Sequence, residues 1–269
     1  SKHLDLSSIK IITSTGSPLA EESFRYVYEN IKKDVHLSSI AGGTDMVGCL
    51  ILGNLYSNVY KGEIQGQSLG IDVDVFTNDA ISTKDGEKGE LVVKQPFPSM
   101  PVKFWGDTGG EKYHKAYFAK FENIWHHGDF IERTSNNGFV MRGRSDTTLN
   151  PGGVRIGTSE IYQQVEDIDF VTEGLVVGQN YKDDVRVVLF VTTKNNQELS
   201  DEQIKFIKSR IRKNCSPKHV PTIIKKVPEI PRTKSGKIVE LAVKKVINGE
   251  ELNNKEAIAN PASLEYFKN

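Results

Sequence analysis

The residues best suited to chemistry lie in the run Pro231–Lys237, which reads Pro-Arg-Thr-Lys-Ser-Gly-Lys. The run places Lys237 on a Gly-Ser turn, just before apolar residues at helical spacing (239, 242, 243 and 246). A lysine ammonium is a compact positive charge with three hydrogen-bond donors on a flexible stem, and Gly236 lets the backbone bend tightly beside a ligand. The run therefore predicts either a lysine that binds a negatively charged group or a solvated lysine on an ordinary turn.

A second group of such residues lies upstream, in the runs Gly143–Asp146, Asn150–Ile156 and Glu160–Ile161. It contains two arginines, whose planar guanidinium groups suit bidentate recognition of phosphate or ribose oxygens. Together with the lysine run, this spacing resembles the C-terminal signatures of the adenylate-forming family, which includes acyl-CoA synthetases and luciferases. That family activates a carboxylate as an acyl-adenylate and then passes the acyl group to a thiol.

The resemblance implies roles for individual residues in binding ATP and the AMP moiety. Lys237 is the implied catalytic lysine at the carboxylate and the α-phosphate, and Arg155 is a second catalytic contact to the α-phosphate. Arg144 is implied at the ribose, and Asn150 as a further nucleotide contact. Each of these residues taken singly is also compatible with an ordinary surface loop.

Other implied roles concern coenzyme A (CoA) and domain movement. The pair Gly152-Gly153 allows a narrow path for the pantetheine arm of CoA, with Gly153 as the contact. Asp146 matches the hinge about which the small domain swings between its two orientations. Arg212 is a candidate contact to a CoA phosphate, or else a solvated helix-face arginine. Acylation of Lys237 by a lysine acyltransferase, reversed by a deacylase, would remove its charge.

The start of the chain predicts a strand at Ile9–Ile12, a turn, and a helix over residues 19–31. Ser17 as N-cap with Pro18 at the first helical position is a good helix start signal. Gly16, Ser17 and Pro18 then lie where a helix N-terminus favours a phosphate or a polar ring edge of a nucleotide. An ordinary strand–helix connection is the alternative.

A second strand, Val35–Ile40, runs into Ala41-Gly42-Gly43-Thr44-Asp45. This stretch resembles the family's Tyr-Gly-x-Thr-Glu motif, with Asp45 in place of Glu and without the leading aromatic residue. It implies nucleotide contacts at Gly42 and Gly43, a catalytic Thr44 at a phosphate, and Asp45 as a ligand of Mg²⁺, which needs only one or two carboxylates. The small side chains before Thr44 also suggest a deep acyl pocket near Gly42. A glycine-rich turn capped by Thr and Asp is the alternative.

The sequence His126-His127-Gly128-Asp129 resembles the family's Thr-Gly-Asp element, so Asp129 is the implied ligand of the ribose hydroxyls. Two adjacent histidines also suggest a metal site. Neighbours on a strand point to opposite faces, however, so they cannot easily share one ion.

The remaining pattern predicts an α/β (α+β) fold in two parts. The resemblance implies that residues 1–145 are the C-terminal part of a large nucleotide- and acyl-binding domain. The pattern itself is β-rich here and includes a hairpin through Asn136-Asn137-Gly138. Residues 146–269 read as a small mobile domain that carries the lysine. In it we expect a capping box at Ser200 and Gln203, a helix stop at Gly249, and a polar tail on the surface after residue 254.

Composition excludes several classes of function. Lys plus Arg and Asp plus Glu both number 35, so the formal charge is zero, which argues against nucleic-acid or anionic-membrane binding. Cys49 and Cys215 are too few for a disulfide scaffold and fit a reducing compartment. No apolar run approaches the ~20 residues of a membrane span. We therefore expect a cytoplasmic protein with neither nucleic-acid partner nor membrane span.

Residues 100–129 and 228–243 and the tail Ala259-Asn260-Pro261 resemble one branch of the family in particular. This is the branch that acts on acetate and acetoacetate. The resemblance implies an acid–thiol ligase that uses acetoacetate, ATP, Mg²⁺ and CoA. An acetyl- or other short- or medium-chain acyl-CoA synthetase, or a non-catalytic nucleotide- or CoA-binding module, are the alternatives. The family's Ser/Thr/Gly-rich phosphate loop is not found in the 269 residues. We therefore expect a C-terminal fragment that is inactive alone.

Overall fold

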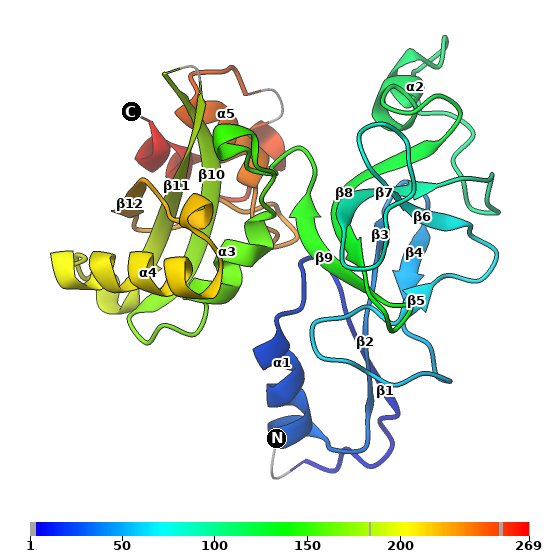
Figure 1. Ribbon diagram of the computed structural model, residues 1–269, viewed down its shortest axis with the longest axis horizontal. Helices are drawn as coiled ribbons and strands as arrows, with labels where there is room; N and C mark the ends of the chain where they lie inside the picture. Colours follow the sequence, from blue (N-terminus) through cyan, green and yellow to red (C-terminus); the bar gives the residue numbers. More distant parts are fainter. Residues whose placement is uncertain (1–3, 183, 253–254, 269) are drawn as a thin grey trace. The chain divides into compact units, whose positions relative to one another are not determined.

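The computed structural model describes residues 4–182, 184–252 and 255–268. The chain divides into two compact units, Ser1–Arg142 and Gly143–Asn269 (Figure 1). We call them unit 1 and unit 2. The division falls close to the boundary expected after residue 145. Strand β9 (Phe139–Arg144) ends just beyond it, so the backbone passes from one unit to the other at the end of a strand.

Unit 1 begins with a parallel pair of strands, β1 (Ile11–Ser14) and β2 (His36–Ser39). The connection between them carries the helix α1 (Glu21–Tyr26), which continues as a π-helical turn, Val27–Ile31. The predicted N-cap at Ser17 is wrong: Ala20 precedes the helix and no side chain caps it. Two acidic residues open the helix instead and complement its positive N-terminal dipole.

The rest of unit 1 is antiparallel. A three-stranded sheet contains β3 (Ala41–Gly43), β4 (Gly48–Leu52) and β5 (Gly66–Gln67). A four-stranded sheet contains β6 (Val73–Phe76), β7 (Lys88–Val93), β8 (Trp125–Arg133) and β9, in that order. One apolar core joins residues of both sheets, including Leu50, Val75, Leu91 and Trp125, with tyrosines of α2 (Glu111–Tyr117) packed against it.

The predicted hairpin between β8 and β9 is confirmed. Thr134 and Gly138 close it, with the Thr134 amide donating to the Gly138 carbonyl over 2.9 Å. Asn137 has a φ of 59°, a left-handed conformation that asparagine tolerates better than most residues. The turn chemistry read from the sequence thus fixes the register of the two strands.

Unit 2 is a three-layer structure around a small sheet. The sheet has β10 (Val171–Tyr181), β11 (Asp184–Thr193) and β12 (Ile223–Lys226), with β11 in the centre. Because side chains alternate along a strand, Val176 and Leu189 face α3 (Thr158–Val165) and α4 (Asp201–Asn214). Their neighbours Leu175 and Phe190 face α5 (Glu240–Ile247) on the opposite side. Figure 1 shows α3 and α4 together on one face of this sheet.

Local signals at the helix ends are confirmed. The Ser200 hydroxyl accepts the Gln203 amide over 3.3 Å, and the Gln203 side chain accepts the Ser200 amide over 2.9 Å. These two bonds form the predicted capping box of α4. After α5, Gly249 has a φ of 71°, the left-handed conformation of a helix stop.

The expected surface tail is confirmed in part for the described residues 255–268: most of them are exposed, but a few side chains are buried. This segment forms short 3₁₀ turns, Lys255–Ala257 and Pro261–Phe267. Leu264 and Phe267 are buried in the core beside α5, and the Phe267 ring packs edge-on against Phe190 with centroids 4.7 Å apart. Spacing of three residues puts both apolar side chains on one side of a 3₁₀ turn, so a mostly polar segment still buries an apolar edge.

Candidate active site

The predicted nucleotide-binding segments of unit 1 leave the same edge of one sheet. Strands β1 and β2 are parallel and in register from Ile11↔His36 to Ser14↔Ser39. Their carboxyl ends meet where the Ile40 amide donates to the Ser14 carbonyl over 2.9 Å. Gly16, Ser17 and Pro18 follow β1, and Gly42 to Asp45 follow β2. In open sheets with parallel strands, this edge is the usual place for a ligand.

Asp129 lies in a bulge of β8. Phe130 pairs with Glu90 and His126 with Val92, so the three residues 127–129 of β8 lie opposite the single residue Leu91 of β7. Gly128 has a φ of 81°, which only glycine adopts readily. Bulges re-aim side chains out of a sheet. Here the bulge separates Asp129 from the regular face of β8 and leaves its side chain almost buried, at 8% exposure.

The β8 bulge approaches the end of β3. A Cβ atom added to Gly43 would lie 3.0 Å from Cε1 of His127, and Nε2 of His127 lies 3.7 Å from Oδ2 of Asp129. The structure therefore brings the predicted Gly43 and Asp129 into one neighbourhood, with His127 between them. A side chain at position 43 would fit only if the His127 ring shifted slightly.

The two adjacent histidines contact different groups, as expected for neighbours on a strand. His126 Nε2 lies 2.9 Å from the carboxylate of the buried Glu90, which also pairs with Lys120. His127 Nδ1 accepts a hydrogen bond from the Trp125 indole N–H over 3.3 Å. Within the part of the chain that the structure describes, no group of three or more His, Cys, Asp or Glu residues could hold a metal ion.

Asp45 is exposed in the turn after β3. Its Oδ2 accepts a hydrogen bond from the Tyr117 hydroxyl of α2, and the Tyr117 ring stacks on Trp125 with centroids 3.6 Å apart. One carboxylate oxygen, with phosphate oxygens and water, is compatible with the way proteins hold Mg²⁺.

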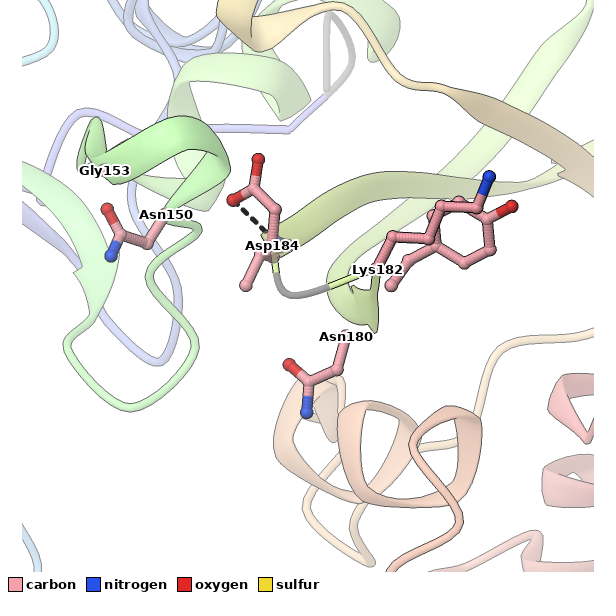
Figure 2. A pocket seen from close by; sticks show the side chains of 7 residues that line it. Asn150, Gly153, Asn180, Lys182 and Asp184 are labelled. Carbon is pink, nitrogen blue, oxygen red and sulfur yellow. Dashed lines mark hydrogen bonds between the residues drawn. The ribbon is translucent and has the colours of Figure 1, made fainter.

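In unit 2, a pocket of about 620 Å³ brings together two predicted residues, Asn150 and Gly153, with the tip of the β10–β11 hairpin. Figure 2 shows Asn150 and Gly153 on one side of this pocket and Asn180 and Lys182 on the other. Gly153 has a φ of 79°, and a Cβ atom there would meet nothing within 4 Å. Glycine therefore allows the left-handed backbone conformation at this position, and without a side chain it leaves the pocket open.

Backbone hydrogen bonds fix the floor of the pocket. The Gly152 amide donates to both carboxylate oxygens of Asp184, over 2.9 and 3.1 Å, and the Val185 amide donates over 2.7 Å. These bonds, first that of Gly152, lower the pKa of Asp184, with a smaller contribution from the charge of Lys218. The 151–153 turn is thus tied to the start of β11.

Tyr181 and Lys182 belong to the lining of this pocket, and two further cations, Arg186 and Lys218, lie next to residues around it. The Tyr181 ring carries Arg186 at 4.1 Å and Lys182 at 5.3 Å from its centroid. The Lys218 ammonium lies beside Gly152, in the space that a side chain there would need. Sequence reasoning missed Tyr181, Asp184 and Lys218, because only the fold places the hairpin tip next to the 150–153 loop.

Lys237 is exposed on a closed turn that leads into α5. Arg232 and Ile238 form a β-bridge across the turn, Gly236 has a φ of 86°, and the Thr233 hydroxyl accepts the Lys237 amide over 3.1 Å. The Gly-Ser turn predicted from the sequence is confirmed. It presents the lysine side chain outward from a backbone that is hydrogen-bonded on both sides.

The C-terminal segment holds this turn from outside. Thr233 bridges to Ile258, the Ala259 amide donates to the Arg232 carbonyl over 2.8 Å, and the Asn260 side chain accepts the Arg232 amide over 2.9 Å. The Arg232 guanidinium also pairs with Glu173 of β10. The lysine turn is therefore fixed to both the sheet and the tail.

The other predicted residues of unit 2 lie on separate elements. Arg144 pairs with Asp146 across 3.7 Å, and the Asp146 carbonyl accepts the Lys244 ammonium over 2.6 Å. Arg155 follows the 151–153 turn, and Arg212 is exposed in the last turn of α4. The pocket lining includes Asn150 and Gly153 but none of these four residues.

Comparison with known proteins identifies the family. The chain is 58% identical over 263 residues to an acetoacetyl-coenzyme A synthetase of Rhizobium meliloti (strain 1021), covering 98% of the chain and 40% of the relative. It is 47% identical over 266 residues to an acetoacetyl-CoA synthetase of Xenopus tropicalis, again over 98% of the chain and 39% of the relative. The chain belongs to the acetoacetyl-CoA synthetase family. No family model matches it.

Solved structures agree with this family. Acetoacetyl-CoA synthetase from Streptomyces lividans superposes with a TM-score of 0.90 at 38% identity, over 99% of the chain and 41% of that protein. A benzoate CoA ligase from Burkholderia xenovorans LB400 superposes with a TM-score of 0.73 at 24% identity, over 88% of the chain and 46% of that protein, which shows the fold alone. The predicted family and fold class are confirmed.

The chain spans about 40% of the length of these acetoacetyl-CoA synthetases. Searched over the described residues, it has no helix with the length and apolar character of a membrane span.

Proposed function

We propose that the protein containing this chain activates acetoacetate with ATP and transfers it to CoA, in the cytoplasm. An acetoacetate carboxylate oxygen attacks the α-phosphorus, and pyrophosphate leaves. The CoA thiol, losing its proton, then attacks the acyl carbonyl, and AMP leaves. The products are acetoacetyl-CoA, AMP and pyrophosphate. The family relationship supports the reaction type, and the exposed Lys237 on its doubly anchored turn is the observation that carries the mechanism.

Residues of unit 1 supply several of the proposed nucleotide contacts. The segments 16–18 and 42–44 leave the shared carboxyl edge of β1 and β2, where Thr44 hydrogen-bonds a phosphate. Asp129, aimed by the β8 bulge, accepts hydrogen bonds from the ribose hydroxyls. Asp45 provides the carboxylate for Mg²⁺, which when bound would offset phosphate charge.

Residues of unit 2 divide between the two half-reactions. Lys237 neutralises charge that develops at the carboxylate and the α-phosphate, and Arg155 assists there. Arg144 and Asn150 contact the nucleotide. We further propose that residues 146–269 form a mobile domain that turns about Asp146, so that Lys237 acts only in adenylation. A lysine acyltransferase and a deacylase acting on Lys237 would then control that step.

The pocket beside Gly153 supports the CoA half-reaction. Its volume of about 620 Å³ lies within the range of small-ligand sites. Lys182 and Lys218 suit a phosphorylated ligand, while Gly153 leaves room for a thin chain. We propose that the pantetheine arm of CoA passes this pocket and that Arg212 contacts a CoA phosphate.

The division of labour is tested on the full-length protein with Lys237→Ala. We expect ATP–pyrophosphate exchange with acetoacetate to fall on the order of 10²–10³-fold, since a charge that stabilises the transition state is lost. Conversion of supplied acetoacetyl-adenylate to the thioester should remain near wild type. Lys234→Ala is the matched control, because Lys234 is exposed on the same turn.

Two results would contradict the proposal. Equal loss of both half-reactions in Lys237→Ala would show that the lysine does not act in adenylation alone. Exchange supported by acetate or butyrate but not acetoacetate would remove acetoacetate as the substrate and leave an acyl-CoA synthetase of another specificity.

A further inference from the structure

A carboxylate lies at the first position of α5, shortly after the lysine turn. Glu240 is half-buried. The Tyr162 hydroxyl donates to its Oε1, and the Thr158 hydroxyl donates to its Oε2 over 3.5 Å. The Thr147 hydroxyl donates to the Arg144 carbonyl over 3.2 Å and lies close enough to Glu240 to lower the pKa of its carboxyl group. The hydrogen bonds to this carboxylate therefore come from two hydroxyl groups of α3, with a third hydroxyl nearby on the segment just after Asp146.

These partners are themselves fixed in place. Thr147 and Thr158 are buried, at 3% and 2% exposure. The Tyr162 oxygen accepts the Val176 amide of β10 over 3.2 Å, so its own proton is directed to Glu240. Burial, with the nearby charge of Glu240, raises the pKa of Tyr162. Two successive hydrogen bonds thus run from the sheet to α5: the Val176 amide donates to Tyr162, and Tyr162 donates to Glu240.

A second bond joins α5 to the same segment. Lys244 follows Glu240 by one helical turn and therefore lies on the same face of α5. Its ammonium donates to the Asp146 carbonyl over 2.6 Å. The helix start is in turn bonded to the lysine turn, since the Val239 amide donates to the Pro231 carbonyl over 3.2 Å. Hydrogen bonds therefore link α5 both to segment 146–147 and to the turn of Lys237.

We propose that Glu240 is a positioning residue for Lys237: Glu240 ties the first turn of α5 to α3, Lys244 ties the next turn to Asp146, and together they fix the lysine turn relative to segment 146–147. The inference rests on the proposed role of Lys237 in adenylation. A rotation about Asp146 then moves the lysine turn as part of one rigid body, and the reach of Lys237 is set by hydroxyl contacts at Glu240.

The test compares Glu240→Gln, Tyr162→Phe and Lys245→Met in the full-length protein. The Gln variant keeps the shape but puts an amide NH₂ where a hydroxyl donor expects an oxygen, and Tyr162→Phe removes one donor from the opposite side. Lys245→Met is the matched control on the same helix. Each variant is measured for ATP–pyrophosphate exchange with acetoacetate, thioester formation from supplied adenylate, and thermal unfolding.

We expect Glu240→Gln to lower exchange about 10- to 100-fold, the effect of a small misplacement of a catalytic group. Thioester formation and the unfolding midpoint should stay near wild type. Tyr162→Phe should lower exchange in the same direction but less, and Lys245→Met should match wild type. If Glu240→Gln does not fold, Tyr162→Phe carries the comparison.

The pH profile gives a readout that a purely structural role would not change. Burial raises the pKa of Glu240, and the charge of Asp146 adds to this effect to a smaller extent. The hydroxyl groups of Tyr162, Thr147 and Thr158 lower the pKa, but the net shift is upward. Protonation removes an acceptor, so exchange should fall on the acid side in wild type, and this fall should be weaker in Glu240→Gln.

Two outcomes overturn the proposal: equal loss of both half-reactions in Glu240→Gln, or exchange unchanged from wild type. Absence of exchange with acetoacetate in the wild-type enzyme overturns the proposed function instead. The three variants are then compared on whichever acid the wild-type enzyme activates.

Discussion

Gly42 of β3 packs directly against the backbone of Gly48 in β4. A Cβ atom at Gly42 would overlap the Gly48 carbonyl and lie 2.5 Å from Cα of Cys49. The sequence suggested a deep acyl pocket near Gly42, and a direct test of such a pocket would be Gly42→Trp, which should reduce activity with acetoacetate more than with acetate. The geometry makes that substitution unsuitable as a test, because any side chain at Gly42 is directed onto the neighbouring strand.

We therefore expect Gly42→Ala to destabilise unit 1 by about 1–3 kcal/mol, the usual cost of overpacking. Gly66→Ala in β5 is the matched control, since a Cβ atom there meets nothing within 4 Å. It should change stability by no more than about 0.5 kcal/mol. Urea unfolding followed at the tryptophans measures both, and equal effects would contradict the close packing at Gly42.

Asp74 should make unit 1 sensitive to acid. Burial tends to raise its pKa, but the Val75 amide, Ser82 and Lys94 together with the charge of Arg133 lower it below 3.8. A lowered carboxyl pKa means that the folded state releases the proton more readily than the unfolded state. Its stabilising contribution is complete above about pH 4 and is lost as the pH falls through the folded-state value.

Asp74→Asn should therefore cost about 1–3 kcal/mol at neutral pH, because the Arg133 guanidinium loses its carboxylate. The variant should also lose less stability than wild type on acidification. Asp72→Asn is the control: this half-exposed carboxylate reaches only Lys94, across 3.4 Å, and its loss should cost no more than about 1 kcal/mol. An unchanged acid transition in Asp74→Asn would refute the assignment.

Asn260→Ala should weaken adenylation although the residue is in the C-terminal tail. Its side chain bonds both the Arg232 amide and the Ile230 carbonyl, over 2.9 and 3.1 Å, and an unpaired backbone group costs about 1–3 kcal/mol. We expect lower pyrophosphate exchange with thioester formation spared. Asn214→Ala, which loses one exposed bond to Gln164, serves as control and should retain both activities.

Gly153→Ala tests the CoA pocket. A methyl group there points into open space, so we expect slower thioester formation and a higher KM for CoA, with pyrophosphate exchange retained. Gly249→Ala controls for backbone strain, since both glycines have similar positive φ values, 79° and 71°. If the two variants behave alike in the CoA-dependent step, Gly153 does not face the pantetheine arm.

Features encoded by neighbouring residues could be predicted from the sequence. The Asn137 hairpin, the Ser200 capping box and the Gly249 helix stop each depend on a few adjacent residues and their backbone preferences. The turn of Lys237 is of the same kind. The motif residues of unit 1 were found by resemblance, and the structure adds the reason for Gly128: it makes the bulge that carries Asp129.

Features that depend on distant contacts could not be predicted. Ser17 has the chemistry of an N-cap, yet the helix begins later, at Glu21, where Lys61 from a different segment pairs with the first carboxylate. The sequence pattern puts Glu240 on the surface of an amphipathic helix. Only the folded structure shows that α3 places Tyr162 beside it. The packing of Gly42 on Gly48 likewise depends on the pairing of two strands.

The bonds between the tail and the lysine turn have an evolutionary consequence. The Arg232 carbonyl accepts the Ala259 amide, and the Arg232 amide donates to the Asn260 side chain. Neither the turn nor the tail therefore keeps its geometry if the other changes. Residues in direct contact are rarely additive in their effects. Selection on the activity of Lys237 therefore acts on the turn and the tail together. Replacing either segment by that of a homologue should preserve activity only when both segments are replaced.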